Sequence, residues 1–349
     1  MSLLVTGATG FIGKELIKEL QDYNGDIFIL AREFSLKKAA NLFCCYENIK
    51  LISGDITKVT VLDDYRDLEL LKGVSKIIHV AGGYDIEMKV EAAYLQNVVG
   101  TQNIIALSKK LPNLKEFHFM SSFSVVGLKL DLADAHTFAS DNEKLSPYAE
   151  SKKQAEKMVR ASFGENKNIS LIIYRLGIVI PNQDGDLEKI DGAYYFLQSL
   201  IKAEKYLRFL PKQMLSFYPY DQKAYLPLIS VRSVADFMGK VIRNNNQGSL
   251  QSYYVVSENK KSIRQFIEES FFNFNIGLIL KPLPIKMGKR LMFGFGIFPN
   301  EISKFLFFRT KLIDEKRSVS QDWIEEHHHI NVKKMVAQTK SFMSRGNHD

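Results

Sequence analysis

The sequence predicts an α/β protein: a Rossmann-type doubly wound parallel sheet, followed by a smaller, mostly helical C-terminal lobe for the substrate. Short apolar runs alternate with longer amphipathic segments through the first half, which is typical of parallel strands joined by helices. A glycine-rich turn follows the first of these runs. After Pro181 the residue composition changes: Gly, Asp and Asn cluster there, and long apolar segments follow.

The individual elements follow from these patterns in chain order. Short apolar runs predict strands at residues 3–6, 27–31, 50–53, 76–80, 116–120 and 170–179. Amphipathic segments predict helices at 11–21 and 89–109, and Pro147 suits the first turn of a helix that extends to about residue 162. We therefore assign residues 1–180 to the dinucleotide-binding domain and 181–349 to the substrate lobe. Two later runs, 226–231 and 252–256, are expected to be strands that return to the main sheet.

The composition is that of an ordinary globular protein. Apolar residues make up 46% of the 349 residues and charged residues 25%, so a large core can form. No uncharged apolar run reaches the roughly 18–20 residues of a membrane span, and no signal-peptide pattern opens the chain. Cys44 and Cys45 are adjacent, which suits neither a structural disulfide nor a metal site and fits a reducing compartment. We expect a cytoplasmic protein, with contact at a membrane surface left open.

The glycine-rich turn predicts a dinucleotide site. In the segment TGATGFIG, Gly7, Gly10 and Gly13 permit a tight turn and a close approach of the backbone to a pyrophosphate. Phe11 and Ile12 open the following helix, whose N-terminus attracts the phosphates. A purely structural glycine turn is the competing interpretation.

The end of the second strand indicates which dinucleotide binds. An NAD site places an acid there for the ribose 2′-hydroxyl, whereas an NADP site offers a cation to the 2′-phosphate. This strand ends in Ala31 and Arg32, which favours NADP(H) over NAD(H), unless Arg32 is only a surface residue. Asp55 and Ile56, after the third strand, are expected to border the adenine. Ala81, after the fourth, is expected to line the far side of the cofactor.

A phenol and an ammonium lie four residues apart at Tyr148 and Lys152, on one face of the predicted helix. A nearby lysine stabilises phenolate and lowers the tyrosine pKa, which general acid–base catalysis needs, and it can also hold the nicotinamide ribose. Ser121, Ser122 and Ser124 follow the fifth strand, where a hydroxyl can hydrogen-bond a substrate carbonyl oxygen. These three serines remain alternatives on the residues alone.

These motifs together resemble the extended short-chain dehydrogenase/reductases. The resemblance covers roughly residues 1–240 and includes TGATGFIG, IIHVAG, NVVGT, MSSFSVVG, YAESK and YRLGIVI, although Leu176 stands where that family usually has proline. It implies that Ser122 is the catalytic serine and Ser124 the less favoured choice. Residues 82–87 (GGYDIE) and 185–196 (GDLEKIDGAYYF) resemble bacterial fatty acyl-CoA and thioester reductases of the same superfamily.

The sequence thus predicts an NADPH-dependent oxidoreductase that reduces a carbonyl of a lipophilic substrate, a fatty acyl thioester or a fatty aldehyde. The Phe and Leu residues after Pro181 are expected to form an acyl tunnel, and acyl-CoA or an acyl carrier protein to be the partner. A nucleotide-sugar epimerase or dehydratase and a 3β-hydroxysteroid-type dehydrogenase are the alternative enzymes. An NADP-binding scaffold or redox sensor is the alternative outside catalysis, and the oligomeric state is open.

The charge pattern bears on the partners. Residues 281–317 hold nine Lys/Arg against three Asp/Glu, among several phenylalanines. This stretch is either a solvated face beside core residues or a surface for anionic lipid or carrier phosphate; no motif suggests nucleic acid. His327, His328 and His329 cannot converge on one metal ion from a helix, so no metal is expected. His79 is expected to be a core histidine, and Asn97 either a site residue or a structural one.

Overall fold

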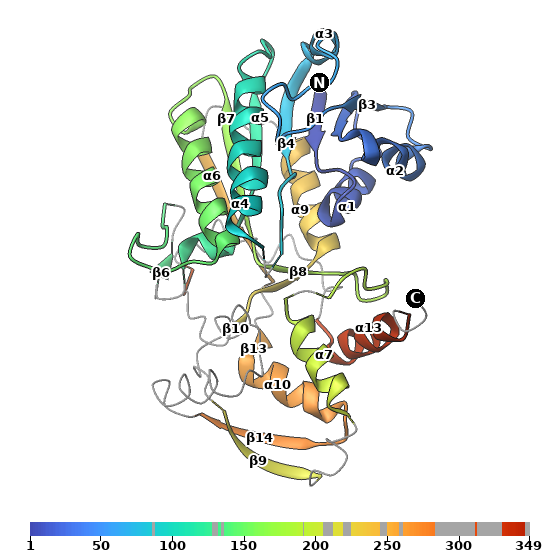
Figure 1. The fold of residues 1–349 in the computed structure, drawn as a ribbon, viewed down its shortest axis with the longest axis vertical. Helices are drawn as coiled ribbons and strands as arrows, with labels where there is room; N and C mark the ends of the chain where they lie inside the picture. The colour runs from blue at the N-terminus through green and yellow to red at the C-terminus, as the bar shows by residue number, and fades with distance from the viewer. Residues whose placement is uncertain are drawn as a thin grey trace.

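Seven parallel strands form the central sheet of the computed structural model (Figure 1), in the order β3-β2-β1-β4-β5-β7-β12. The structure describes residues 1–85, 88–127, 132–133, 136–190, 192–204, 212–218, 225–244, 250–257, 261–282, 311–312 and 330–345. The strands of the sheet are β1 (Ser2–Thr6), β2 (Ile27–Ala31), β3 (Ile49–Ser53), β4 (Val74–His79), β5 (Glu116–Ser122), β7 (Ser170–Leu176) and β12 (Leu250–Val255).

Helices cover both faces of the sheet, as predicted for a doubly wound fold. One face packs on α1 (Phe11–Glu19), α2 (Glu33–Phe43) and α9 (Val231–Arg243). The other packs on α3 (Asp67–Leu71), α5 (Gly100–Ser108) and α6 (Pro147–Phe163). Each face has its own apolar core, and the strands between them are buried on both sides, which explains their continuous apolar sequence.

The strand order reverses between β1 and β4, which pair in parallel although the chain reaches β2 and β3 first. Ligands of open α/β sheets bind beyond the carboxyl ends of the strands at such a point. The glycine turn follows β1 there and the segment from Val80 to Asp85 follows β4. This reversal is what brings residues from the first third of the chain to those from the middle.

Three sequence-based expectations about elements need correction. The helix predicted at 89–109 is interrupted: α4 (Val90–Ala93) passes into a π-helical turn, η1 (Tyr94–Val99), before α5. The strand predicted at 170–179 breaks at Gly177 into β7 and β8 (Ile178–Ile180), because Gly177 closely approaches the carbonyl oxygen of Pro227. Of the two returning runs, 250–255 joins the main sheet, whereas β11 (Leu228–Ser230) pairs with β8 in a separate small sheet.

The C-terminal lobe lies beyond β8, at the lower end of the view in Figure 1. Its core is built mainly by α7 (Tyr194–Lys202), α10 (Ile263–Phe272) and α13 (Val332–Arg345). A pair of parallel strands, β9 (Gln213–Tyr218) and β14 (Gly277–Pro282), lies at its edge. Two further pairs of short strands are present. β10 (Tyr225–Leu226) pairs with β13 (Lys261–Ser262), and β6 (Leu132–Ala133) pairs with β15 (Lys311–Leu312).

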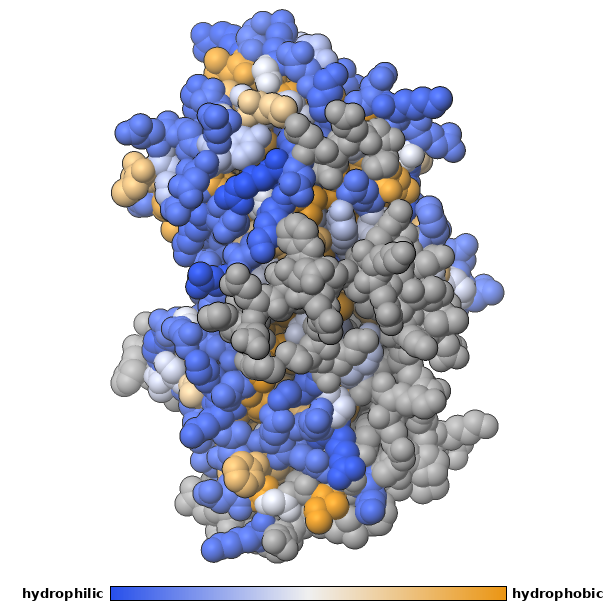
Figure 2. Space-filling model, turned by 180° about the vertical axis from the view of Figure 1, so that it is seen from behind, coloured by the Kyte–Doolittle hydropathy of each residue, from blue (hydrophilic) through white to orange (hydrophobic). Residues whose placement is uncertain are grey.

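The face shown in Figure 2 is mostly hydrophilic where the described residues form it. Large apolar side chains that are exposed, such as Phe34, Val59 and Phe272, lie on different elements. Within the described residues, the structure holds no helix that is both long and apolar enough to cross a membrane.

Candidate active site

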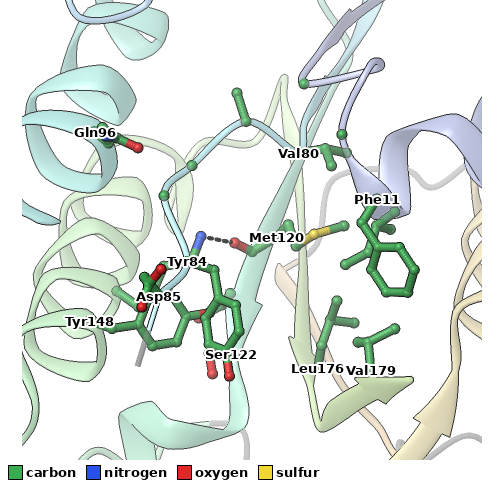
Figure 3. A pocket seen from close by; sticks show the side chains of 18 of the residues that line it. Phe11, Val80, Tyr84, Asp85, Gln96, Met120, Ser122, Tyr148, Leu176 and Val179 are labelled. Atoms are coloured by element: carbon green, nitrogen blue, oxygen red, sulfur yellow. Dashed lines mark hydrogen bonds between the residues drawn. The ribbon is translucent and has the colours of Figure 1, made fainter. Parts of the chain in front are cut away.

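A cavity of about 690 Å³ runs across the carboxyl ends of the central strands, within the usual size range of small-molecule sites. Its residues come from the loops after β1, β2, β3, β4 and β5, from the start of α6, and from the segment that leads into the lobe. Figure 3 shows Tyr84, Tyr148 and Ser122 gathered on one side of this cavity, with Phe11, Leu176 and Val179 across from them.

The glycine turn forms one wall of the cavity, and its backbone is crowded. Gly7 has φ +76°, and a Cβ there would lie 2.6 Å from the amide nitrogen of Ala81. A Cβ on Gly13 would lie 2.1 Å from the carbonyl oxygen of Gly7. Gly10 caps α1 without a side chain, so the first amides of the helix face the cavity wall unshielded. Phe11 and Ile12, which the sequence suggested for a pyrophosphate site, also line the cavity, and so does Ala81, which was expected at the far side of the cofactor.

The loop after β2 contributes Arg32 to the cavity, the one arginine among the described residues that line it. Arg32 is exposed, lines the cavity, and lies with its guanidinium 4.3 Å from the centroid of the Phe34 ring. Among the described residues it forms no ion pair with a carboxylate, so its charge is available to an anion. Asp55 and Ile56 also line the cavity, and the Asp55 carboxylate accepts hydrogen bonds from the amide and hydroxyl of Thr57, each at 2.8 Å.

The three serines at and just after the end of β5 have different hydrogen bonds. Ser121 is buried and donates to the carboxylate of Glu156. Ser124 donates its hydroxyl proton to the oxygen of Ser122 at 2.9 Å, and the Ser124 amide also points to that oxygen at 3.2 Å. The Ser122 oxygen is therefore an acceptor in both contacts, and its own proton remains available to a ligand. This pattern favours Ser122 over Ser121 and Ser124 as the donor to a substrate carbonyl.

Tyr148 and Lys152 lie on the face of α6 that lines the cavity. Ser146 caps this helix by accepting from the amide of Ala149, and Pro147 occupies the first turn, as predicted. Lys152 is buried and donates to the carbonyl oxygen of Met120 at 2.7 Å, the bond drawn in Figure 3. Burial lowers the pKa of Lys152 to about 8, against the opposing effect of the Glu156 carboxylate.

The sequence reasoning did not single out Tyr84 as a site residue. Its ring meets that of Tyr148 edge-on, with the centroids 4.7 Å apart, and it lines the cavity while remaining 43% exposed. The position directly after the fourth strand, in the segment GGYDIE, is the signal that could have identified it. Tyr84 is thus the aromatic neighbour of the candidate general acid.

Asn97 and His79 support the site from behind. The Asn97 side chain bonds both the amide and the carbonyl of Gly83, at 2.8 and 3.1 Å, and donates to the hydroxyl of Ser151 at 2.9 Å. Asn97, which lies in the π-helical turn η1, therefore holds the loop that carries Tyr84 against α6. His79 is buried between the hydroxyls of Thr6 and Thr101, and burial together with the Lys152 charge lowers its pKa to about 3. It is a neutral core histidine, as predicted.

A segment that leads into the lobe crosses the cavity. Glu188 pairs with Lys14 on α1, and Lys189 pairs with Asp85 at 2.8 Å, so the segment bridges the walls after β1 and β4. On its outer side Gln338 of α13 donates to the carbonyl oxygens of Asn182 and Gly185, at 2.9 and 2.6 Å. The stretch that carries GDLEKIDGAYYF is therefore part of the site rather than a remote loop.

Several expectations fall on residues outside those described. They include most of the basic stretch 281–317 and the three histidines at 327–329. Within the described residues no group of three or more His, Cys, Asp or Glu is arranged to hold a metal. Of the apolar lobe residues, Leu187 and Tyr194 line the cavity, whereas Phe196, Leu197 and Phe266 pack in the core of the lobe. The expected acyl tunnel therefore has few apolar contributors from the lobe helices that the structure describes.

Comparison with known proteins gives one family match that covers most of the chain. A family model described as male sterility protein matches residues 5–226. A putative dihydroflavonol 4-reductase of Synechocystis sp. is 30% identical over 237 residues, which is 66% of this chain and 60% of that protein. Fatty acyl-CoA reductase 2 of Bos taurus is 29% identical over 150 residues, 37% of this chain and 29% of that protein. The chain thus spans less than two thirds of the length of either relative.

Solved structures agree on the fold. The terminal R domain from the myxalamid PKS-NRPS biosynthetic pathway superposes with a TM-score of 0.70 at 20% identity, covering 99% of this chain and 91% of that one. At this identity the likeness concerns the fold alone.

Proposed function

This chain belongs to the male sterility protein family, among the extended short-chain dehydrogenase/reductases, and from that membership we propose that it is an NADPH-dependent reductase of a lipophilic carbonyl compound. The extended short-chain dehydrogenase/reductases are nicotinamide-dependent enzymes. The observation that carries the proposal is that one cavity joins the glycine turn and Arg32 to Ser122, Tyr148 and Lys152.

The residues from the end of β5 and the start of α6 suit carbonyl reduction. A bound NADPH supplies the hydride. Ser122 donates a hydrogen bond to the carbonyl oxygen as negative charge develops there. Tyr148 gives its phenolic proton to that oxygen when the product is an alcohol, and the Lys152 cation stabilises the phenolate left behind. Lys152 also hydrogen-bonds the nicotinamide ribose in this proposal.

The preference for NADPH is supported by the charge of Arg32. Arg32 lines the cavity and in this proposal would contact the ribose 2′-phosphate, while the end of β2 offers Ala31 and no acid that would select NAD. Gly7, Gly10, Phe11, Ile12 and Gly13 would receive the pyrophosphate, and Asp55, Ile56 and Ala81 would border the rest of the cofactor.

A fatty acyl thioester or a fatty aldehyde is the proposed substrate. The two segments that resemble acyl reductases both reach the cavity, through Tyr84 and Asp85 on one side and Leu187 and Lys189 on the other. Relatives include proteins named fatty acyl-CoA reductase. An acyl-CoA or an acyl-carrier protein would deliver the thioester.

A screen of NADPH oxidation across acyl-CoAs, fatty aldehydes and nucleotide sugars tests this proposal. Each methylene that the cavity buries contributes up to about 0.8 kcal/mol, which is a few-fold in kcat/KM. We therefore expect kcat/KM to rise from short to long acyl chains. A flat or falling profile, or turnover of a nucleotide sugar alone, would exclude the acyl-reductase assignment. Absence of turnover with every class would favour the scaffold or redox sensor.

A further inference from the structure

A fully buried carboxylate lies directly behind the catalytic groups. Glu156 is on α6, one turn after Lys152, and its side chain is 0% exposed. One carboxylate oxygen accepts the hydroxyl proton of Ser121 on β5 at 2.5 Å. The other accepts from Arg175 on β7 at 2.7 Å and from Arg160, one turn further along α6, at 2.9 Å.

The partners of Glu156 are themselves anchored. Arg175 is also fully buried and donates to the phenol oxygen of Tyr254 on β12 at 2.6 Å, with the Phe138 ring 4.9 Å from its guanidinium. Arg160 donates to the hydroxyl of Ser252 at 2.8 Å. A buried ion pair is stable only when its hydrogen bonds are satisfied in this way. The carboxylate therefore has one fixed position relative to β5, β7 and β12.

That position connects the two elements that carry the catalytic groups. Three consecutive residues at the end of β5 have separate tasks: the Met120 carbonyl holds Lys152, the Ser121 hydroxyl binds Glu156, and Ser122 lines the cavity. Glu156 and Lys152 are four residues apart and lie on the same side of α6. The bond between Ser121 and Glu156 thus fixes the strand end against the helix at the level of the site.

We propose that Glu156 is a positioning residue of the catalytic centre, which fixes the end of β5 against α6 so that Ser122 and Tyr148 meet the same carbonyl oxygen and Lys152 stays close to Tyr148. This inference rests on the proposed function, because the residues that Glu156 positions are the ones assigned there. A misplacement of the catalytic groups by about 1 Å can reduce turnover by ~10²-fold. The contact between β5 and α6 should therefore affect kcat, even though Glu156 does not contact the substrate.

Glu156 also affects the charge of Lys152. Among the described residues, the titratable groups that interact with the Lys152 charge are His79 from β4, which is neutral, and Glu156 from its own helix, while Tyr148 lies one turn before Lys152 on the cavity side. The Glu156 carboxylate raises the pKa of Lys152 against the larger effect of burial. Although burial opposes its own ionisation, the Arg175 and Arg160 cations hold the pKa of Glu156 below its usual range. Loss of the carboxylate charge should therefore lower the Lys152 pKa further.

The test compares three variants of the full chain. Glu156→Gln removes the charge and keeps the shape. Ser121→Ala removes the hydrogen bond to β5 and keeps the charge. Glu165→Gln makes the same charge change at an exposed residue just beyond the end of α6. The measurements are kcat, KM, the pH profile of kcat/KM, the melting temperature, and the Lys152 pKa from NMR of 13C-lysine-labelled protein, with the signal assigned by Lys152→Met.

We expect Glu156→Gln to lower kcat at least ~10-fold with little change in KM, and to shift the Lys152 pKa and the pH profile downward. Ser121→Ala should lower kcat less and leave the Lys152 pKa unchanged, and Glu165→Gln should change nothing. A lower melting temperature with unchanged kcat and pH profile would show a purely structural role and overturn the proposal. If Glu156→Gln does not fold, an unchanged kcat in Ser121→Ala overturns it instead.

The NMR measurement separates this inference from the proposed function. If the wild-type protein turns over no carbonyl compound, the proposed function fails, and the Lys152 pKa is still measurable. An equal Lys152 pKa in the wild type and in Glu156→Gln would then overturn the role of Glu156, whereas a downward shift would support it.

Discussion

Replacement of Arg32 by alanine should remove the proposed preference of this chain for NADPH over NADH. The two cofactors differ only in the 2′-phosphate, and Arg32 is the cavity residue proposed to contact that group. The Phe34 ring, 4.3 Å from the guanidinium, limits the conformations available to the side chain. The Arg32→Ala substitution therefore tests how much this one positive charge contributes to NADPH binding.

The expected magnitude follows from the exposure of the arginine. Two unit charges about 4 Å apart in water interact with about 1 kcal/mol, and a phosphate monoester carries a charge of about −1.5 to −2 at pH 7. Screening at physiological ionic strength reduces this contact because Arg32 is exposed. We expect NADPH to bind at least about tenfold more tightly than NADH, which corresponds to about 1.4 kcal/mol.

The assay is a titration of each dinucleotide, followed by its fluorescence, at two salt concentrations. In Arg32→Ala the two dissociation constants should converge, mainly through weaker binding of NADPH. Lys37→Ala is a matched control, because Lys37 is an exposed cation on the same helix that does not line the cavity. Equal affinities in the wild-type protein, or an unchanged ratio in Arg32→Ala, would refute the assignment of the 2′-phosphate site.

Three further predictions concern the rest of the cavity. Tyr148→Phe keeps the ring contact with Tyr84 but loses the proton, so turnover should fall by roughly 10²–10⁴ with little change in NADPH affinity; near-native turnover in a steady-state assay would exclude Tyr148 as the acid. Burial lowers the pKa of Lys152 to about 8, and the group is charged below this pH, so kcat/KM for reduction should decline as pH rises through about 8. A profile flat from pH 6 to 10 would contradict a role for that charge. Gly13→Ala would place a Cβ 2.1 Å from the Gly7 carbonyl oxygen, and it should abolish measurable NADPH binding or folding, as read by titration and thermal melting; a tightly binding variant would show that the turn does not hold the pyrophosphate.

Local pattern was enough to identify most of the main sheet. The strands at 27–31 and 116–122 begin where the apolar runs predicted, because a strand buried on both faces is rich in apolar residues. Interruptions within helices and strands were harder to predict from the sequence. The π-helical turn at 94–99 and the break at Gly177 depend on partners distant in sequence, Gly83 and Pro227, which local periodicity does not include.

The same distinction applies to the site. The spacing of Tyr148 and Lys152 could be read on one helix face, and the glycine turn could be identified from its own sequence. By contrast, the contacts of Tyr84, Asn97 and Glu156 could not be read from the sequence, since each is made with a residue on another element.

The sequence by itself determined the fold class, the family and the chemistry available, because glycine spacing, apolar alternation and the Tyr/Lys pair are properties of short segments. The tertiary structure alone shows how the three serines differ in their hydrogen bonds, since the Ser121 hydroxyl donates to Glu156 and the Ser124 hydroxyl to Ser122. It also decided that the segment around Glu188 and Lys189 crosses the cavity. Such assignments depend on the distances between elements. The order of the strands in the sheet sets these distances, and the order of residues in the chain does not reveal them.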